Sequence, residues 1–550
     1  MQPTDTQNTI DTIITYHNQT KHQPEQYAAG PDFMDWIHQP NPFRTFTGAP
    51  RIELPLCADQ ITTLYTELYQ ADITPKPLNK NNIATLLELS LGLSAWKQYG
   101  NDQWSLRCNP SSGNLHPTEG YVFLPPLTDL PAGVYHYNSH DHALEQRAEI
   151  VQMQHADFQQ SLPSDCFLLG LSSITWREAW KYGERAFRYC QHDIGHALGA
   201  ITYAARSLGW DAQILINWSD DDIAQLFGLN HKDSFAQAEK EVPEVVLCIK
   251  TQFVPNLQQI DAKLLHNLLK NQQWFGQANI LSKKKQFQWD IIDVAVKATE
   301  KPQTTEIIWR ASLNTPLLPL DCCSATTNTV IRQRRSAQQF DGTGVLNKNA
   351  FFRILDSLLP RKSGFPFTVL PQMPAINLVL FVHRVTDMSS GLYILIRQQD
   401  ILETLQAKMR AEFQWEKPAD CPSHLPLYRL VSANARKFAR SLSCHQDIAA
   451  DSAFSLGMIA DFSARLEKGA WQYRRLFWEA GLIGQVLYLE AEAAGYRGTG
   501  IGCYFDDAMH NTLGLSDLTY QSLYHFTIGK ALEDHRLNTL EPYAHLKNHV

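Results

Sequence analysis

The chain has 550 residues, of which 44% are hydrophobic and 19% charged, and its formal net charge is −8. This composition excludes a disordered protein, and the acidic balance argues against nucleic-acid binding. The length exceeds what one hydrophobic core supports and predicts two domains. We find no signal sequence, no membrane-spanning apolar stretch and no CxxC or Cys/His metal spacing, so we expect a reduced, cytoplasmic protein with no membrane, nucleic-acid or metal partner.

The first half of the chain predicts a helix, a short apolar strand, a Gly-Val-Tyr turn, a long helix and a closing strand. The first helix follows the tetrapeptide LNKN at 78–81, where Ile83, Leu86, Leu87 and Leu93 recur at helical spacing. The later elements are expected, in order, at 121–127, 133–137, 187–208 and 244–249.

The second half repeats this order. A second LNKN occurs at 346–349, and the later elements are expected at 376–382, 391–395, 473–496 and 524–529. Gly195 and Gly209 recur as Gly481 and Gly495, in both cases 286 residues later (481 − 195 and 495 − 209). The two LNKN motifs are separated by 268 residues (346 − 78), so the copies differ in loop length. A period this long indicates a duplicated domain and not a solenoid.

We therefore expect two α+β domains with antiparallel-rich sheets flanked by helices, at 1–255 and 326–550. The segment 256–325 is polar, with a lysine run at 283–285, and is predicted to be a linker that also packs.

Three stretches are typical of ligand-binding segments. A proline-bracketed turn, PSSGN, offers hydroxyls and an amide to the edge of a planar ring. An arginine-rich stretch beginning at Arg332 suits a phosphate. A run of glycines, GTGIG, lets the backbone approach a ligand. Each stretch has a structural alternative: a plain turn for PSSGN, a solvated basic helix face for the arginine-rich stretch, and a simple helix-to-strand turn for GTGIG. The candidate residues are Pro110, Ser111, Ser112 and Asn114 in the first stretch, Arg334, Arg335, Ser336 and Gln338 in the second, and Gly500, Ile501, Gly502 and Cys503 in the third.

Together these stretches resemble the nitroreductase family of FMN flavoproteins. The family's phosphate-binding motif is matched by Arg334, Arg335, Ser336 and Phe340, although Gln338 stands where the family usually has a basic residue. The resemblance implies that the PSSGN turn reaches the edge of the flavin ring and that GTGIGC lines another side of it. It also implies a late basic phosphate contact, for which Arg536 is the candidate.

Residues 30–260 are more specifically similar to SagB-type dehydrogenases. The matching segments include FRTFTGAPRIELPL at 43–56, PAGVYHY at 131–137 and WREAWKYGERAFRY at 176–189. These enzymes use FMN to oxidise azoline rings on ribosomal peptides. The resemblance implies that Lys181 and Tyr182 are catalytic, with the lysine acting as base. A surface lysine beside a core tyrosine is the alternative. Further polar candidates near these motifs are His116, Glu119, Glu184, His192 and Asp193.

The two halves keep different motifs. The first half has the PSSGN turn but no arginine-serine motif, and the second half has the arginine-serine motif and GTGIG but no PSSGN turn. We therefore predict an intrachain pseudo-dimer with one FMN site between the halves, in a monomer or a homodimer. The expected function is an FMN-dependent dehydrogenase of azoline-like rings, acting on a small molecule or a modified peptide. The alternatives are an NAD(P)H-dependent nitroreductase or quinone reductase, and a non-catalytic flavin-binding subunit that assembles with peptide-modifying enzymes.

Overall fold

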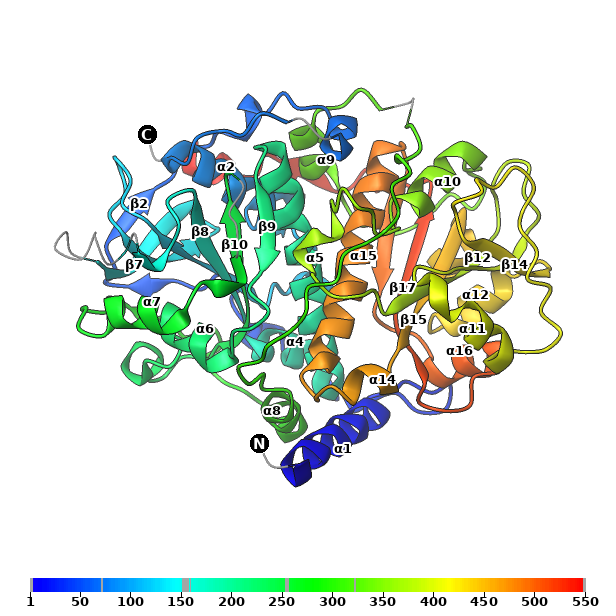
Figure 1. The fold of residues 1–550 in the computed structure, drawn as a ribbon, viewed down its shortest axis with the longest axis horizontal. Coiled ribbons are helices and arrows are strands. Elements are labelled where there is room, and N and C mark those ends of the chain that lie inside the picture. Colours follow the sequence, from blue (N-terminus) through cyan, green and yellow to red (C-terminus); the bar gives the residue numbers. More distant parts are fainter. Residues whose placement is uncertain are drawn as a thin grey trace.

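The computed structural model of the protein describes residues 3–70, 73–150, 158, 160–252, 257–320 and 323–547. Two α+β halves lie side by side, and the long helices α5 (Ala186–Ser207) and α15 (Gln472–Ala493) run between them (Figure 1). No helix in the described part of the chain has the length and apolar character needed to cross a membrane.

The first half is built on a seven-stranded antiparallel sheet. Its order is β2-β7-β6-β5-β8-β10-β9, where β2 is Arg51–Glu53, β5 Thr118–Leu124, β6 Gly133–Asn138, β7 Ala143–Glu149, β8 Cys166–Ser173, β9 Asp211–Ile214 and β10 Val242–Lys250. Strands β5, β6 and β8 are buried along their whole length, and β5 and β6 also bury polar residues such as Glu119 and His136. The turns predicted at 133–137 and 391–395 are wrong, because these residues form strands β6 and β13 (Gly391–Leu395).

The second half repeats this topology in a six-stranded antiparallel sheet. Its order is β14-β13-β12-β15-β17-β16, where β12 is Ile376–Val382, β13 Gly391–Leu395, β14 Leu427–Ser432, β15 Phe454–Asp461, β16 Arg497–Ile501 and β17 Tyr520–Gly529. These strands correspond one to one to β7 through β9 in spatial order. The expected α+β class and the duplicated architecture are confirmed in this arrangement.

Helices flank both sheets. In the first half and the connecting segment they are α1 (Pro3–Gln19), α2 (Lys80–Ser90), α4 (Thr175–Tyr182), α6 (Asp220–Phe227), α7 (Ala262–Leu269) and α8 (Asp290–Ala298). In the second half they are α9 (Thr327–Gln333), α10 (Lys348–Asp356), α11 (Leu402–Lys408), α12 (Arg436–Leu442), α13 (Asp447–Asp451), α14 (Ser463–Leu466), α16 (Asp506–Leu513) and α17 (Ala544–Lys547).

The repeated LNKN motif is a helix start in both halves. The Asn79 side chain accepts a hydrogen bond from the Asn82 backbone N–H, and the Asn347 side chain accepts one from Asn349. The prediction that Leu93 belongs to the first helix is wrong. Helix α2 ends at Ser90, and Leu93 begins strand β3 (Leu93–Tyr99), which pairs with β4 (Asp102–Arg107).

The two long helices pack through glycine. The bounds of α5 and α15 differ by the same 286 residues as their glycines (472 − 186). A Cβ atom on Gly195 would clash with the backbone oxygen of Trp478, and one on Gly481 would clash with the backbone oxygen of His192. Such reciprocal contacts between equivalent positions are what a two-fold axis produces, so the halves are arranged as in a symmetric dimer.

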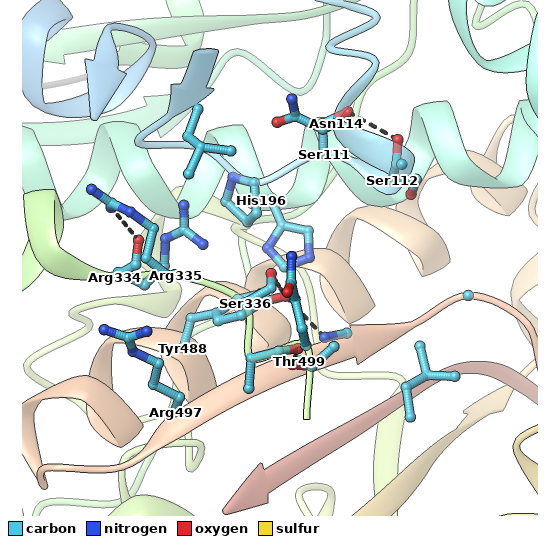
Figure 2. A pocket seen from close by; sticks show the side chains of 18 of the residues that line it. Ser111, Ser112, Asn114, His196, Arg334, Arg335, Ser336, Tyr488, Arg497 and Thr499 are labelled. Atoms are coloured by element: carbon cyan, nitrogen blue, oxygen red, sulfur yellow. Dashed lines mark hydrogen bonds between the residues drawn. The ribbon is translucent and has the colours of Figure 1, made fainter. Parts of the chain in front are cut away.

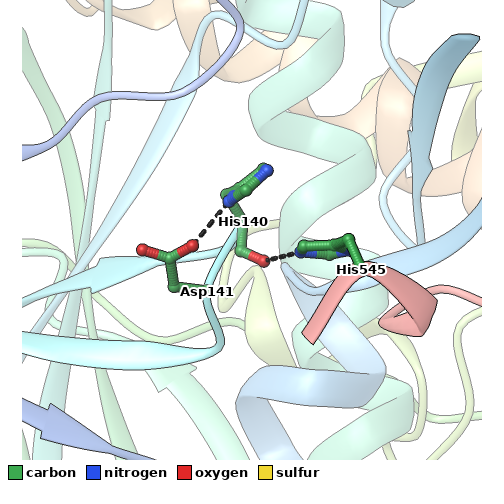
Figure 3. Close-up of side chains that lie close together, drawn as sticks. All are labelled: His140, Asp141 and His545. Atoms are coloured by element: carbon green, nitrogen blue, oxygen red, sulfur yellow. Dashed lines mark hydrogen bonds and ion pairs between the residues drawn. The ribbon is translucent and has the colours of Figure 1, made fainter. Parts of the chain in front are cut away.

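Each half also sends an arm onto the other. Tyr16 of α1 packs edge-to-face on Tyr473, with ring centroids 6.2 Å apart. In return, β18 (Asn538–Leu540) pairs with β3. Beyond β18, His545 Nε2 lies 2.8 Å from the backbone oxygen of His140 in the turn between β6 and β7 (Figure 3). Because α1 packs on the second half and β18 pairs with a strand of the first half, the two halves contact each other through their terminal segments as well as through the long helices.

The segment predicted as a linker, 256–325, is not extended throughout. It contains α7, α8 and the short strand β11 (Gln277–Ala278), which pairs with β1 (Phe46–Thr47). The segment therefore packs on the first half before the chain enters the second.

Candidate functional site

A cavity of about 460 Å³ lies at the junction of the two halves and brings the three predicted motifs together. Its volume falls in the range of ordinary small-molecule sites. The predicted cofactor residues all line it: Pro110, Ser111, Ser112, Asn114, Arg334, Arg335, Ser336, Gln338, Gly500, Ile501, Gly502 and Cys503. Figure 2 shows the arginines gathered on one side, the Ser111–Asn114 turn on another, and His196 between the turn and strand β16.

One end of the cavity is cationic. Arg334 is 4% exposed; its Nη2 donates to the backbone oxygen of Arg107 at 3.0 Å, while its Nε has no hydrogen-bond partner among the described residues. Burial lowers the pKa of Arg334, because the charge is removed from water without a paired carboxylate. Burial, and then the Arg334 charge, lowers the pKa of Arg335 to about 10. Lys97 and Arg497 line the same end. Arg497 is paired with Glu533 at 2.6 Å, whereas Arg334 has an unpaired buried donor and no carboxylate partner among the described residues, so this end is suited to an anion.

A tyrosine joins the arginine-serine segment to the glycine-rich strand. The hydroxyls of Tyr488 and Ser336 lie 2.7 Å apart, and the Gly500 N–H donates to the Tyr488 hydroxyl at 2.9 Å. The Thr499 hydroxyl donates to the Ala337 backbone oxygen at 2.7 Å. A Cβ on Gly500 would overlap the Tyr524 hydroxyl, so this glycine is required by close packing of an aromatic side chain. These contacts fix the segment beside β16.

The PSSGN turn is held by carboxylates from two helices. The Ser112 N–H donates to Asp193 Oδ1 at 3.1 Å, and the Ser111 hydroxyl donates to Glu178 Oε1 at 3.4 Å. Gly113 adopts a φ of +60° and Asn114 a φ of +61°, in the left-handed region that glycine and asparagine tolerate best. The turn therefore has a specific backbone conformation that the side chains of Glu178 and Asp193 hold in place, and it is half-buried.

Aromatic rings line the space between the two ends. His196 Nε2 and the Tyr524 hydroxyl lie 3.0 Å apart, and His192 stacks on the Tyr524 ring with centroids 4.2 Å apart. Burial lowers the pKa of His196 to about 3, which keeps this ring neutral. Neutral aromatic walls leave room for a planar, uncharged ring system.

Lys181 and Tyr182 end helix α4 beside the turn. Tyr182 lines the cavity, and its ring contacts Tyr189 with centroids 4.7 Å apart. A side chain at position 113 would meet the Tyr182 hydroxyl at 2.5 Å and Lys181 Nζ at 3.1 Å, so both groups lie against Gly113. Burial, followed by the charge of Glu178, raises the pKa of Tyr182 well above its usual value.

The polar candidates around these motifs fall into two groups. His116, His192 and Asp193 lie at or directly behind the cavity, whereas the Glu184 carboxylate accepts hydrogen bonds from Gln19 near the surface. Glu119 belongs to the supporting network described next.

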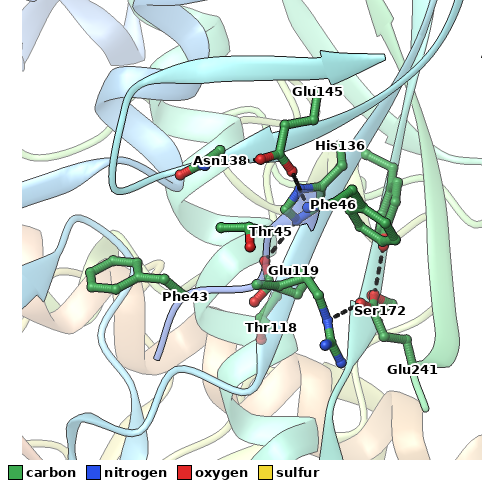
Figure 4. Close-up of polar contacts among 12 residues, drawn as sticks. Phe43, Thr45, Phe46, Thr118, Glu119, His136, Asn138, Glu145, Ser172 and Glu241 are labelled. Atoms are coloured by element: carbon green, nitrogen blue, oxygen red, sulfur yellow. Dashed lines mark hydrogen bonds and ion pairs between the residues drawn. The ribbon is translucent and has the colours of Figure 1, made fainter. Parts of the chain in front are cut away.

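A buried charge network supports the turn from the first sheet (Figure 4). His136 lies between two carboxylates, 3.1 Å from Glu119 Oε2 and 2.9 Å from Glu145 Oε2. Burial opposes protonation of this ring, but the hydrogen bonds to both carboxylates outweigh it and raise the pKa of His136 to about 9. Arg177 donates to Glu119 Oε1 at 2.5 Å and to the backbone oxygen of His116 at 2.6 Å. The network thus connects strand β5 to the end of the PSSGN turn.

Several cavity residues are absent from the predicted set. Lys97, Tyr488, Arg497 and Tyr524 line the cavity, and none belongs to the motifs that the sequence analysis selected. Arg497 directly precedes the GTGIG run, which is the one sequence signal for it. Arg536, the candidate for the late basic contact, is 73% exposed in its side chain and pairs with Asp534 at 2.7 Å.

A separate histidine cluster lies on the surface of the first half. Ligand atoms of His140, Asp141 and His545 lie within 4.8 Å of one another, a spacing that a metal ion can use (Figure 3). Asp141 already accepts from Arg51 at 2.6 Å and contacts His140 Nδ1 at 2.5 Å, which accounts for this cluster as ion pairs.

Comparison with known proteins agrees with this architecture. Residues 73–238 match the model of the Nitroreductase family. A crystal structure of an Anabaena variabilis protein classed provisionally as a nitroreductase aligns with a TM-score of 0.68 and 19% identity, covering 95% of this chain and 99% of that chain. The fold of the whole chain is therefore nitroreductase-like.

Two further structures match less than half of the chain. The E. coli microcin synthetase McbBCD complex with truncated pro-MccB17 has 17% identity and a TM-score of 0.28, covering 42% of this chain and 80% of that chain. A nitroreductase-type protein from Exiguobacterium sibiricum in complex with FMN has 15% identity and a TM-score of 0.23, covering 37% of this chain and 88% of that chain. These scores lie below the range that defines a shared fold. No curated protein matches the chain.

Proposed function

We propose that the protein is an FMN-dependent oxidoreductase that holds one FMN in the cavity between its halves. The buried guanidinium of Arg334 carries this proposal, because it has an unsatisfied Nε and no carboxylate partner in the described part of the chain. A buried cation without a counterion is costly, so its natural partner is an anionic group of a ligand. The FMN phosphate is such a group.

The remaining lining residues fit the rest of FMN. Arg335, Ser336, Lys97 and Arg497 would surround the phosphate with charge-assisted donors. At the other end, the PSSGN turn offers side-chain donors and acceptors to the edge of the ring, and the walls formed by Tyr189 and Tyr524 are aromatic. A cationic end, an aromatic middle and a polar edge match the three chemical parts of FMN.

A single FMN per chain is supported by what occupies the position that the duplication relates to the proposed FMN cavity; we call it the counterpart position. There, the short helix η9 (Phe367–Val369) precedes β12 as the PSSGN turn precedes β5, and η9 packs directly against β9, the counterpart of β16. Phe365 fills the same region, with its ring 4.8 Å from Tyr203 and 5.0 Å from Tyr69. Each chain would then hold one complete site, and a second copy would not be needed.

We further propose that the reaction is dehydrogenation of an azoline-like ring, presented by a small molecule or a modified peptide. FMN, when bound, would supply a two-electron acceptor for a hydride. Removal of the accompanying proton requires a base, and the proposed base is Lys181; the contact of its amine with the PSSGN turn at Gly113, beside Tyr182, supports this choice. Tyr182 stays protonated because of its raised pKa and can donate a hydrogen bond into the cavity.

Reduction of the bound flavin under anaerobic conditions tests this assignment. Purified protein loaded with FMN is mixed separately with an azoline-containing peptide and with NADH or NADPH, and bleaching of the flavin absorbance is followed. Rapid bleaching by the azoline alone supports the dehydrogenase. Bleaching by the nicotinamide alone would replace it with the reductase, and no bleaching by either would replace it with a non-catalytic flavin-binding subunit. Failure to bind FMN at all would contradict the whole proposal.

A further inference from the structure

The polar side chains of the PSSGN turn each have a partner within the protein. The Ser111 hydroxyl accepts from the backbone N–H of His116 at 2.8 Å, and the Ser112 hydroxyl donates to a carboxylate of helix α5 at 3.3 Å. The Asn114 side chain donates through Nδ2 to the backbone oxygen of Ser105 at 2.9 Å. These contacts fix the shape of the turn.

His116, two residues after the turn, is the exception. It lines the cavity and is 2% exposed, and its ring atom Nδ1 is buried with no hydrogen-bond partner among the described residues. Within 110–117 no other buried side-chain nitrogen or oxygen lacks a partner. A buried polar atom without a partner is costly, so Nδ1 is expected to meet a group that the cavity receives.

The other ring nitrogen decides which hydrogen-bonding role Nδ1 takes. His116 Nε2 lies 2.9 Å from Asn114 Oδ1, and the orientation of this amide is fixed because its Nδ2 donates to Ser105. An amide oxygen only accepts, so Nε2 carries the hydrogen and Nδ1 of the neutral ring carries a lone pair. Burial, and then the charges of Arg107 and Arg177, lowers the pKa of His116 well below its usual value, which keeps the ring neutral.

The backbone around His116 holds the ring in one position. His116 has a φ of +53°, which is uncommon for a residue other than glycine, and it directly precedes Pro117. Its N–H donates to the Ser111 hydroxyl, and its backbone oxygen accepts from Arg177 Nη1 at 2.6 Å. Arg177 also donates to Glu119, a member of the buried charge network (Figure 4). The Nδ1 acceptor is therefore preorganised before a ligand enters the cavity.

We propose that His116 Nδ1 accepts a hydrogen bond from FMN held in the cavity, and that Asn114 is the positioning residue that orients this acceptor. The inference rests on the proposed function. The arginines at the cationic end supply donors for a phosphate, and His116 supplies an acceptor, which a phosphate cannot use. FMN carries two kinds of donor that an imidazole can accept from, the N3–H of its ring and the hydroxyls of its ribityl chain.

Glutamine and asparagine at position 116 separate the acceptor from the rest of the side chain. In His116→Gln the amide nitrogen can still donate to Asn114, but no acceptor stands at the place of Nδ1. In His116→Asn the amide oxygen takes that place, and asparagine tolerates a positive φ. In a fluorescence titration, His116→Gln should bind FMN about tenfold more weakly than the wild type, and His116→Asn should stay within about threefold of it. An equal loss in both variants, or a loss below about threefold in His116→Gln, would overturn the inference.

His142→Gln is the matched control. His142 is 1% exposed and has a φ of +48°, but it lies outside the cavity. Both of its ring nitrogens have partners, the Tyr137 hydroxyl at 2.8 Å and the backbone oxygen of Pro55 at 3.2 Å. This substitution should leave FMN affinity unchanged in protein that is folded by circular dichroism. A loss equal to that of His116→Gln would show a general effect of replacing a buried histidine and would overturn the inference.

Analogues of FMN identify the donor that His116 accepts from. 3-Methyl-FMN lacks the N3–H, and analogues without one ribityl hydroxyl each lack one of the other donors. The wild type should bind one of these analogues about tenfold more weakly than FMN, and His116→Gln should bind that analogue and FMN equally. Analogues that discriminate to the same extent in both proteins would overturn the inference.

The same titrations separate this inference from the proposed function. Wild-type protein that binds FMN with the expected dependence on His116 but dehydrogenates no azoline would overturn only the proposed reaction. FMN binding that does not depend on His116 would overturn only the inference. Wild-type protein that binds no FMN would overturn both.

Discussion

Replacement of Arg334 by methionine isolates the contribution of the anion-binding end. Methionine keeps an apolar stem beside Tyr488, whose ring centroid lies 5.1 Å from the Arg334 guanidinium carbon. The variant loses the unpaired Nε donor and the bond to the Arg107 backbone oxygen. A hydrogen bond between a charged group and a phosphate contributes about 1.5–3 kcal/mol, and a guanidinium can form two. We expect a loss of about 3 kcal/mol, which corresponds to roughly a hundredfold weaker FMN binding.

The same substitution should leave the FMN-free protein at least as stable as the wild type. The buried guanidinium has no counterion in the described structure, so its removal relieves a desolvation cost that offsets the lost bond to Arg107. Fluorescence titration with FMN gives the dissociation constant, and chemical denaturation without FMN gives the free energy of unfolding. Arg206→Met is the matched control, since Arg206 donates to the backbone oxygens of Leu68 and Gln70 away from the cavity. FMN affinity within threefold of wild type in Arg334→Met, or an equal loss in the control, would refute the reasoning.

Three further predictions address the base, the charge network and the helix pair. Lys181→Ala should abolish substrate oxidation and leave the flavin spectrum of the bound cofactor intact; loss of the flavin would make the residue structural. The folded-state pKa of His136 is raised from 6.5 to about 9, so its stabilisation is complete below about pH 6.5 and is lost as pH rises through 9. The wild type should exceed His136→Asn in unfolding free energy by about 3 kcal/mol more at pH 6 than at pH 10, and an equal difference at both would contradict the assignment. Gly195→Ala brings a methyl group against the Trp478 backbone oxygen and should cost roughly 1–3 kcal/mol in thermal or chemical unfolding, whereas Gly30→Ala, in open space, should be neutral.

The duplicated organisation could be predicted from sequence because it leaves two independent signals. The LNKN motifs recur since each asparagine caps a helix, and Gly195 and Gly481 recur since α5 and α15 touch at that level. Both constraints are local or symmetric, so they appear directly as a separation between identical residues. The common strand order of the two sheets follows from the same duplication.

The exchanged elements could not be predicted in this way. Strand β18 has three exposed residues and pairs with β3, more than four hundred residues earlier in the chain. Such a short strand has no alternating pattern, and its partner is set only by the way the two halves dock. The early end of α2 has a local cause: Gly92 packs against the Glu88 backbone and the Tyr543 hydroxyl, so the chain turns into β3 before Leu93.

The site was predictable where a motif is contiguous and not where it is assembled from separate helices. The PSSGN, arginine-serine and glycine-rich segments are short strings, and all of them line one cavity. Tyr488 and Tyr524 are single aromatic residues within apolar elements, and their sequence context is that of core residues. The assignment of these residues to FMN remains a prediction.

The amount of FMN bound per chain tests the central claim most directly. Protein saturated with FMN and freed of excess cofactor is analysed by native mass spectrometry, and the flavin is quantified by its absorbance after denaturation. One FMN per chain is predicted, because the anion-binding end comes from the second half, the PSSGN turn from the first, and the counterpart position is filled by η9 and Phe365. Two FMN molecules per chain, or none, would contradict a single site between the two halves.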